Sequence, residues 1–244
     1  MMPHDNFWNL ISRYVSVYRS DPVSTTASSI ILEDGTEIPT DVLFAGTGWD
    51  TSSRFMSPAQ VCEVGLPHEP SQDTAETTQT WKTLMEEADK NIIGDYPILA
   101  TPPSDRKPSL TAARLYQGIA PLTDPSIVFL GRTRLPNGFF GAEAGAIWAT
   151  AYWSGLIRLP PLGEAQSKVA YMNAFSRRRY PSGGGDGLNF SKDLIWYVDG
   201  LLTEAGLTSH RKGWWADWDE PFVISDLRDC KDEYLAKYGA EIRI

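Results

Sequence analysis

A continuous apolar run passes directly into a glycine turn at residues 41–49, which read Asp41-Val42-Leu43-Phe44-Ala45-Gly46-Thr47-Gly48-Trp49. Four apolar residues in a row, from Val42 to Ala45, predict a β-strand that is covered on both faces. Gly46 and Gly48 permit either a tight turn or a close approach of the backbone to a ligand, because glycine lacks a Cβ atom. Residues 41–49 therefore predict a buried strand that ends at such a turn.

The sequence before this run also carries β signals. Residues 29–32 (Ser-Ile-Ile-Leu) are a short apolar segment, Asp34-Gly35 supplies turn chemistry, and residues 36–38 follow it. This order predicts two short strands joined by a turn. We therefore expect a β-rich segment over residues 1–57.

Helical patterns dominate the later part of the chain. After a Pro-, Ser- and Glu-rich loop, Asp73 and Glu76 resemble a capping box, and Gly94 supplies a stop signal. Between them, apolar residues recur on one helical face, at Trp81, Leu84, Met85, Ala88 and Ile92. Residues 58–108 are therefore expected as a loop followed by a helix.

The remaining residues, 109–244, predict one more strand and several helices. Residues 127–130 (Ile-Val-Phe-Leu) favour a buried strand, and residues 138–156 favour a helix that is apolar on all sides and so is buried or borders a cavity. Amphipathic helices follow from about residue 164, from an N-cap at Ser191 to Gly206, and from an N-cap at Ser225 to Gly239. The expected fold class is α/β, with β structure in front and helices behind, in a single domain over residues 1–244.

Composition restricts the class of protein. The chain has 244 residues, of which 42% are apolar, enough for one sizeable core or two small lobes. Its net charge of −9 argues against non-specific nucleic-acid binding, which needs a basic surface. The two cysteines, Cys62 and Cys230, exclude a disulfide scaffold or a cysteine-only structural zinc site and fit a reducing cytosol.

Targeting signals also bear on the location. The first twenty residues contain no apolar core of a secretory signal, and the longest apolar run, residues 144–157, is too short to span a bilayer. We therefore expect a cytoplasmic protein without a transmembrane segment. The tryptophan-rich residues 214–218 lie among acidic residues, so packing over a pocket or core is favoured over membrane insertion.

Common catalytic and phosphate-binding motifs are missing. The sequence has no G-x-S-x-G, H-E-x-x-H or Walker A pattern, and its histidines, His4, His68 and His210, are expected in exposed loops. No metal site is therefore expected. The glycines of residues 183–187 follow no strand and open no helix, which favours a flexible loop over a phosphate cradle. The preceding arginines, residues 177–179, are expected as a helix C-terminal cluster.

Several motifs in fixed order carry a family resemblance. Residues 41–49 resemble the D-x-(V/I)-(I/V)-x-A-T-G-(Y/W) motif of flavin-containing monooxygenases. Residues 115–121 (Leu-Tyr-Gln-Gly-Ile-Ala-Pro) and 124–131 (Asp-Pro-Ser-Ile-Val-Phe-Leu-Gly) resemble a late segment of that family's FAD domain, above all in its fungal members. The helix at 141–156 and the pattern from Asp193 to Leu202 continue the likeness, which covers nearly the whole chain but only the C-terminal half of the family.

The resemblance implies a truncated two-domain FAD/NAD(P)-binding fold. Members of the family are much longer and carry two G-x-G-x-x-G motifs, one for FAD and one for NADPH, and this sequence has neither. Residues 1–57 would correspond to the linker between the NADPH and FAD domains, and residues 109–244 to the FAD-domain-like and C-terminal helical part. Without the glycine turn that holds a pyrophosphate, the isolated chain is expected to bind no cofactor.

The resemblance also places the candidate site. In this family the segment that corresponds to residues 131–148 lies beside the flavin ring and the substrate pocket, so that Gly46, Thr47, Gly48 and Gly131 would be remnants of a flavin contact. The aromatic residues expected to bind substrate are Trp49, Phe139, Phe140, Trp148 and Trp153. The polar candidates are Arg132, Arg134, Asn137 and Glu143, and Glu143 reads equally well as a catalytic acid or as a first-turn helix residue.

Three functions remain open at this point. The first is a cofactor-independent cyclisation or isomerisation of a small hydrophobic metabolite, such as a terpenoid or polyketide of fungal specialised metabolism, in which one bound conformer lowers the entropic barrier. The second is an FAD- and NADPH-dependent monooxygenase whose FAD-binding half comes from a partner or is missing from the gene sequence. The third is a non-enzymatic remnant that associates with a larger flavoprotein.

Overall fold

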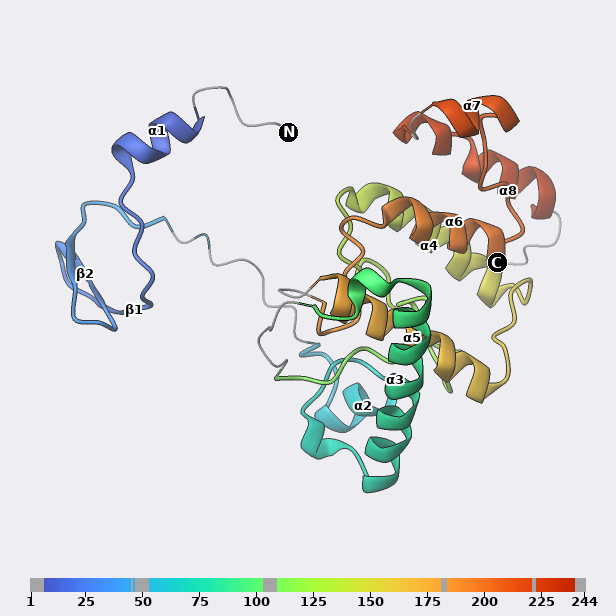
Figure 1. Ribbon diagram of the computed structural model, residues 1–244, viewed down its shortest axis with the longest axis horizontal. Coiled ribbons are helices and arrows are strands. Elements are labelled where there is room, and N and C mark those ends of the chain that lie inside the picture. Colours follow the sequence, from blue (N-terminus) through green and yellow to red (C-terminus); the bar gives the residue numbers. More distant parts are fainter. Residues whose placement is uncertain are drawn as a thin grey trace. The chain divides into compact units, whose positions relative to one another are not determined.

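A computed structural model describes residues 7–44, 46, 53–102, 109–180, 184–220 and 223–239 (Figure 1). The chain forms two compact units, Met1–Ser52 and Ser53–Ile244, which are described separately. Helices and two small antiparallel sheets make up the described elements, so the expected mixed α/β class is confirmed.

The described residues of the first unit form one helix and a three-stranded sheet. Helix α1 (Phe7–Tyr14) precedes strands β1 (Pro22–Thr25), β2 (Ser29–Leu32) and β3 (Glu37–Pro39), which pair antiparallel in that order. The turn between β2 and β3 contains Gly35 with a φ of +82°, a conformation that favours glycine. The two short strands expected around Asp34-Gly35 are therefore present.

The strand expected at residues 42–45 is not present, and that prediction is wrong. Val42, Leu43 and Phe44 are irregular and 64%, 61% and 90% exposed, whereas Ala45 and residues 47–49 lie outside the described residues. An apolar run becomes a buried strand only when other layers cover both of its faces. In the described part of this unit, only Ser29 and Leu32 are buried, so no such layer is available there.

The second unit is mainly helical. Its longer helices are α3 (Ala75–Asp95), α4 (Gly138–Trp153), α5 (Leu162–Arg179) and α6 (Leu194–Glu204). The shorter elements are α2 (Pro58–Glu63), α7 (Trp214–Asp219), α8 (Cys230–Tyr238), the 3₁₀ turns η1 (Pro70–Gln72), η2 (Pro97–Leu99) and η3 (Ile224–Leu227), and the hairpin of β4 (Leu115–Tyr116) and β5 (Ala120–Pro121). Among the described residues, no helix is both long and apolar enough to cross a membrane.

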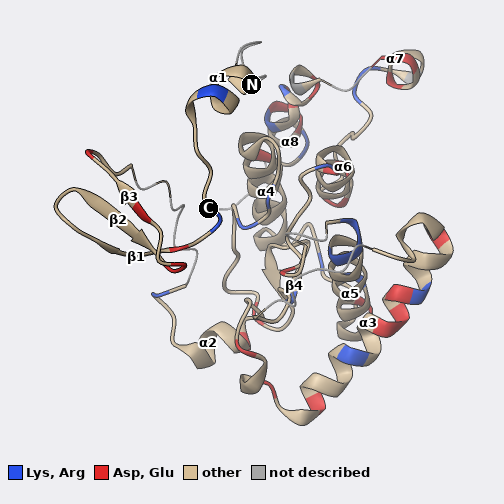
Figure 2. Ribbon diagram, turned by 60° about the vertical axis from the view of Figure 1, so that its left-hand side comes forward, with Lys and Arg blue, Asp and Glu red and all other residues tan. Residues whose placement is uncertain are grey.

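Two helix pairs build the core of this unit. Helix α3 packs on α5, and α4 packs on α6 (Figure 1). The largest fully buried side chains include Trp148 of α4, Phe190, and Leu201 and Leu202 of α6. Charged residues are spread along α3, whereas α4 carries only Glu143 (Figure 2). Despite its apolar sequence α4 is buried on one face only, because Phe139, Ala146 and Trp153 on the other face are exposed.

Several helix boundaries differ from those expected. Helix α3 is capped by Thr74, whose side chain accepts a hydrogen bond from the Thr77 N–H, and not by Asp73. Helix α6 begins at Leu194, after Ser191, and the helix expected from Ser225 is divided into η3 and α8. Residues 127–130 form no strand, although the Phe129 N–H donates to the Ile119 carbonyl. The end of a helix depends on which nearby side chain caps it, and the preferences of single residues do not determine this. Helix bounds expected from sequence can therefore differ from the observed ones by a few residues.

The tryptophans of α7 also differ from the prediction. Trp215 is 70% exposed and Trp218 is 82% exposed, so within the described unit these two rings cover no pocket or core. The expected C-terminal arginine cluster, in contrast, is present in the last turn of α5, where Arg177 and Arg178 also pair with Asp89 of α3. These ion pairs join α5 to α3 and add to the apolar contact between the two helices.

Candidate functional site

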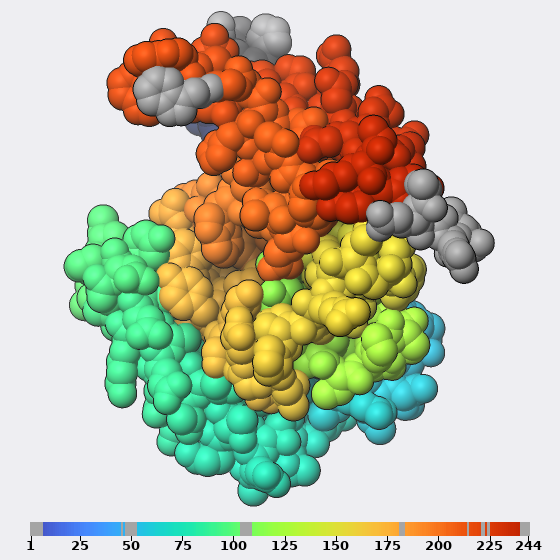
Figure 3. Space-filling view, turned by 90° about the vertical axis from the view of Figure 1, so that its right-hand side faces the viewer, coloured from blue at the N-terminus to red at the C-terminus, as the bar shows by residue number. Residues whose placement is uncertain are grey.

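A cleft of about 520 Å³ lies between the β4–β5 hairpin, helix α5 and helix α6. Figure 3 shows this face of the second unit hollowed between the segments of α5 and α6. Its lining is mostly apolar and includes several aromatic rings; the residues are Tyr116, Gln117, Lys168, Val169, Tyr171, Met172, Trp196, Tyr197, Asp199, Gly200, Thr203, Glu204, Ser209 and His210. A concave, largely apolar site of this size with a few polar groups is typical of small-molecule binding.

The β4–β5 hairpin and helices α4, α5 and α6 together form one carboxylate network at the base of the cleft. Glu204, the last residue of α6, accepts hydrogen bonds from the Tyr116 hydroxyl at 2.9 Å and from Gln117 Nε2 at 2.8 Å. Its other oxygen accepts from Trp148 Nε1 of α4 at 2.8 Å. Lys168 of α5 donates to the Tyr116 oxygen at 3.1 Å and lies 5.6 Å from the centre of that ring. Lys168, Tyr116 and Glu204 are therefore linked in series by two hydrogen bonds.

The hairpin turn places Gln117 for two contacts. Gln117 has a φ of +54° and Gly118 a φ of +68°, so both occupy the left-handed region that a tight hairpin turn requires. The Gln117 carbonyl accepts from the Tyr197 hydroxyl at 2.9 Å, while its side chain reaches Glu204. A non-glycine residue in this conformation is strained, and such strain is concentrated at functional sites.

Burial sets the protonation of the phenol in the network. Burial, followed by the negative charge of Glu204, raises the pKa of Tyr116 well above its ordinary value of 10.0. Tyr116 therefore remains a neutral hydrogen-bond donor at physiological pH. Burial also raises the pKa of Asp199 in the same cleft, while the nearby His210 opposes this rise.

The four predicted substrate-binding aromatics that the structure describes, all on α4, do not line one cavity. Phe139 and Trp153 lie on the exposed face of α4, at 87% and 59% exposure, and Phe140 packs at the edge of the core. Trp148 is fully buried and supports the cleft from behind through its bond to Glu204. Trp49 lies outside the described residues. Their role in substrate binding stays a prediction.

The predicted polar residues are also dispersed. Asn137 caps α4, because its side chain accepts a hydrogen bond from the Phe139 N–H at 3.1 Å. Arg134 pairs with Asp186, Arg132 is half-buried, and Glu143 is exposed on α4. None of these four residues lines the cleft between α5 and α6.

The remnant glycines give a similar result. Thr47 and Gly48 lie outside the described residues, and Gly46 has open space around its Cα. Gly131 has a φ of +72° and is exposed. A flavin contact at these four positions stays a prediction.

Sequence patterns missed both the cleft network and a buried histidine. His68 was expected in an exposed loop but is 3% exposed, and that prediction is wrong. Its ring contacts the Leu66 carbonyl and Asp73, and Asp73 in turn is held by both terminal nitrogens of Arg114, at 2.7 and 2.5 Å. Asp73 was expected as a helix cap. The signal that could identify this group is the close spacing of three possible ligands in the sequence, Cys62, His68 and Asp73.

By sequence the chain is a homologue of the fungal FAD-dependent monooxygenases, which confirms the resemblance found in its motifs. FAD-dependent monooxygenase rstn6 of Aspergillus nomiae is 32% identical over 253 residues, covering 99% of this chain and 44% of that protein. FAD-dependent monooxygenase resA of Aspergillus sclerotiorum is 31% identical over 255 residues, covering 99% of this chain and 44% of that protein. An FAD-dependent monooxygenase of Pyrenophora dematioidea is 30% identical over 223 residues, covering 87% of this chain and 40% of that protein.

The chain thus spans less than half the length of these curated relatives, a coverage consistent with the C-terminal part of such a protein. No family model matches the chain. No solved structure matches it either.

The described residues do not fit the pyrophosphate of FAD. Such a group is held by a strand, a glycine turn and a helix N-terminus within a parallel sheet, whereas both described sheets are antiparallel. The glycine loop before α6 serves packing instead. A Cβ on Gly184 would lie 2.0 Å from the Ser176 carbonyl oxygen, and one on Gly187 would lie 1.8 Å from the Asn173 side chain. These glycines allow the loop to lie against α5.

A substitution distinguishes the packing role from a phosphate-binding role. Gly184→Ala is expected to lower the free energy of unfolding by about 1–3 kcal/mol, because the new methyl group overlaps backbone atoms. Urea unfolding followed by circular dichroism measures the change. Gly94→Ala in α3 is the control: nothing lies within 4 Å of its Cβ position, and alanine there is expected to leave stability unchanged or raise it by up to about 1 kcal/mol. Equal effects of the two substitutions would contradict the packing role.

Proposed function

We propose that this chain is the substrate-binding part of a fungal FAD-dependent monooxygenase, and that a larger flavoprotein partner or a further segment supplies the flavin. The cleft between the β4–β5 hairpin, α5 and α6 holds an apolar organic metabolite in this proposal. The observation that carries it is this mostly apolar, aromatic cleft of about 520 Å³ in a homologue of FAD-dependent monooxygenases.

The lining provides both affinity and orientation. Trp196, Tyr197 and Met172 present apolar surface, whose burial against a ligand is favourable. Lys168 donates to Tyr116 and forms an ion pair with Glu164 at 3.9 Å. Both side chains of that ion pair are at least half exposed, so the Lys168 ammonium remains accessible to a carbonyl or hydroxyl oxygen of the substrate. A metabolite with an apolar body and one oxygenated end, such as a terpenoid or polyketide, matches this arrangement.

Cleft variants test where the ligand binds. With 1-anilinonaphthalene-8-sulfonate, an apolar anion, as fluorescent probe, we expect Trp196→Ala and Lys168→Met each to weaken binding about tenfold, which corresponds to ~1.4 kcal/mol. Trp153→Ala removes an equally exposed tryptophan outside the cleft and is expected to leave binding unchanged. If Trp153→Ala weakens binding as much as the cleft variants do, the probe does not report on this cleft.

A chimera tests the proposed function itself. The portion of the Aspergillus nomiae relative that this chain does not match is joined to this chain and compared with that portion alone and with this chain alone. The chimera is expected to bind FAD and to oxidise NADPH faster in the presence of an apolar substrate. This chain alone is expected to be colourless. A folded chimera without flavin, or one whose NADPH oxidation no apolar substrate accelerates, would contradict the proposal.

A second function, a cofactor-independent cyclisation or isomerisation, is favoured by the network of Lys168, Tyr116 and Glu204. Tyr116 donates its hydroxyl hydrogen to Glu204 and accepts from Lys168, so the network holds the Lys168 ammonium in place, where it can donate a hydrogen bond to developing negative charge on the substrate. In this case the chain alone converts substrate without FAD or NADPH, and Tyr116→Phe is expected to lower kcat about 100-fold. Turnover that requires added flavoprotein would exclude this second function.

A further inference from the structure

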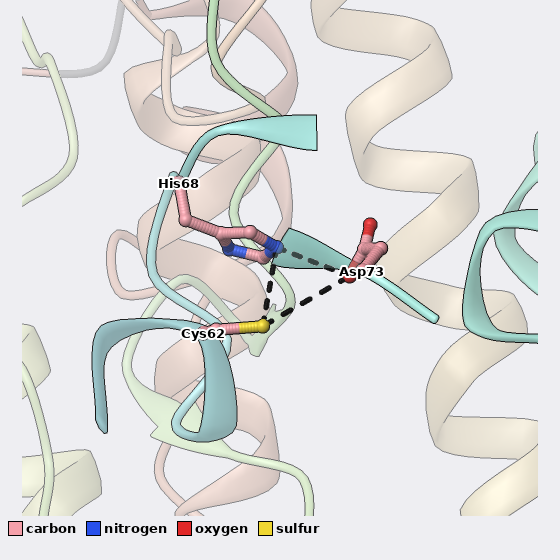
Figure 4. A group of neighbouring side chains, drawn as sticks. All are labelled: Cys62, His68 and Asp73. Carbon is pink, nitrogen blue, oxygen red and sulfur yellow. Dashed lines mark hydrogen bonds and ion pairs between the residues drawn. The ribbon is translucent and has the colours of Figure 1, made fainter. Parts of the chain in front are cut away.

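Three electron-pair donors converge at the start of α3, outside the cleft described above. Three side chains point toward one another in Figure 4. They are Cys62 of α2, His68 of the following loop and Asp73, which precedes α3. Cys62 Sγ lies 3.5 Å from His68 Nε2, and His68 Nε2 lies 3.1 Å from Asp73 Oδ1. The third edge, from Cys62 Sγ to Asp73 Oδ1, is 4.0 Å.

The hydrogen bonds of His68 determine which nitrogen faces this group. His68 Nδ1 lies 2.7 Å from the Leu66 carbonyl oxygen, which only accepts, so Nδ1 carries a hydrogen. In a neutral imidazole, Nε2 then presents its lone pair to the Asp73 carboxylate. Two acceptors at 3.1 Å need a cation between them, either a proton or a metal ion. A backbone carbonyl that fixes the far nitrogen in this way is the usual support of a metal-binding histidine.

The spacing of the three donors fits a tetrahedral metal ion. Zn–S and Zn–N bonds of ~2.3 and ~2.0 Å at a tetrahedral angle place sulfur and nitrogen about 3.5 Å apart, and nitrogen and oxygen about 3.3 Å apart. The distances from His68 Nε2 are 3.5 Å to Cys62 Sγ and 3.1 Å to Asp73 Oδ1. The longest edge, from Cys62 Sγ to Asp73 Oδ1, is 4.0 Å, about 0.5 Å longer than the tetrahedral sulfur–oxygen spacing.

The surroundings of the three residues complete such a site. Arg114 donates to both oxygens of Asp73, which leaves Oδ1 a second lone pair toward His68 and Cys62. The side chains of His68 and Asp73 are 0% and 4% exposed. Cys62 and Asp73 also line a cavity of about 340 Å³, which gives an ion a route in and leaves room for a fourth ligand.

We propose that Cys62 Sγ, His68 Nε2 and Asp73 Oδ1 bind one divalent transition-metal ion, with Zn²⁺ the best match. A thiolate and an imidazole select zinc over Mg²⁺ and Ca²⁺, which prefer oxygen ligands. Arg114 is a positioning residue that fixes the Asp73 carboxylate. Water or an oxygen donor of a ligand takes the fourth position, on the side of the cavity.

Metal content and the spectrum of the Co²⁺ form test the site on the full chain. After incubation with Zn²⁺ and gel filtration, we expect one zinc per chain by mass spectrometry. The Co²⁺ form is expected to show the intense visible bands of a tetrahedral ion and a near-ultraviolet thiolate-to-cobalt charge-transfer band. This measurement uses the unaltered chain, so it does not depend on the folding of any variant.

Matched variants assign the ligands. Cys62→Ser and His68→Asn are expected to lower zinc affinity at least about 100-fold, whereas Cys230→Ala, at the other cysteine of the chain, is expected to retain it. Circular dichroism of the metal-free proteins shows whether each variant is folded. No zinc on the unaltered chain, Co²⁺ bound without the thiolate band, or equal loss in the Cys62 and Cys230 variants would each overturn the proposal.

Discussion

Arg114→Met is expected to lower the free energy of unfolding by about 3–5 kcal/mol, because it leaves the buried Asp73 carboxylate without the guanidinium that binds both of its oxygens. The Asp73 side chain is 4% exposed, and both of its oxygens accept from the guanidinium of Arg114. The hydrogen bonds from Arg114 also hold the pKa of Asp73 below its ordinary value of 3.8. Urea unfolding in buffer that contains a chelator measures the loss free of any bound metal.

An exposed ion pair of the same kind is the control. Arg134 pairs with Asp186, but the two side chains are 54% and 29% exposed, so Arg134→Met is expected to change stability by less than about 1 kcal/mol. The double variant Arg114→Met/Asp73→Asn removes the uncompensated charge and is expected to recover part of the loss. Similar effects of Arg114→Met and Arg134→Met would show that the Asp73 pair is not a buried contact in solution.

Trp148→Ala is expected to lower the free energy of unfolding by a similar amount, about 3–5 kcal/mol. Trp148 is fully buried, and its ring stacks against Tyr116 at 6.2 Å and against Tyr152 at 5.4 Å between ring centres. The substitution opens a cavity in the core and also removes the Nε1 hydrogen bond to Glu204. Because Glu204 orders the base of the cleft, the same variant is expected to weaken probe binding.

A second tryptophan of the same helix provides the comparison. Trp153→Ala is expected to change stability by less than about 1 kcal/mol, because Trp153 is 59% exposed. Trp148→Phe keeps an aromatic ring in the core and is expected to lose less stability than Trp148→Ala. Thermal and urea unfolding of the three variants measure the order. A larger loss from Trp153→Ala than from Trp148→Ala would place the core on the opposite face of α4.

Local sequence patterns predicted most helices but few of the tertiary contacts. Side-chain periodicity and capping act within one element, and they predicted three features correctly. These are the apolar positions of α3, the start of α4 at Asn137–Gly138 and the basic last turn of α5. The strand expected at residues 42–45 failed because burial depends on what covers the segment. An apolar run indicates that burial would be favourable, but it does not show whether other elements pack against both of its faces.

The candidate cleft could not be found in the same way. Its central hydrogen bonds join Tyr116 to Lys168, 52 residues away, and to Glu204, 88 residues away. Each of these residues looks like an ordinary surface position in its own helix or strand. Only the packing of the hairpin, α5 and α6 brings the three polar groups to one point.

The amino-acid sequence alone determined the relationship to the fungal monooxygenases and the helical character of the second unit. It also determined that the chain has no glycine-turn motif for a dinucleotide. Each of these properties depends on residues that are close together in the sequence. Only the tertiary structure places the buried His68 beside Cys62 and Asp73 and lets Glu204 accept three hydrogen bonds. It also places the aromatic residues of α4 on different faces of that helix, some buried and some exposed. The physical reason is range: helix periodicity and turn preferences act over a few residues, whereas burial and ion pairing depend on groups that meet only when distant segments pack together.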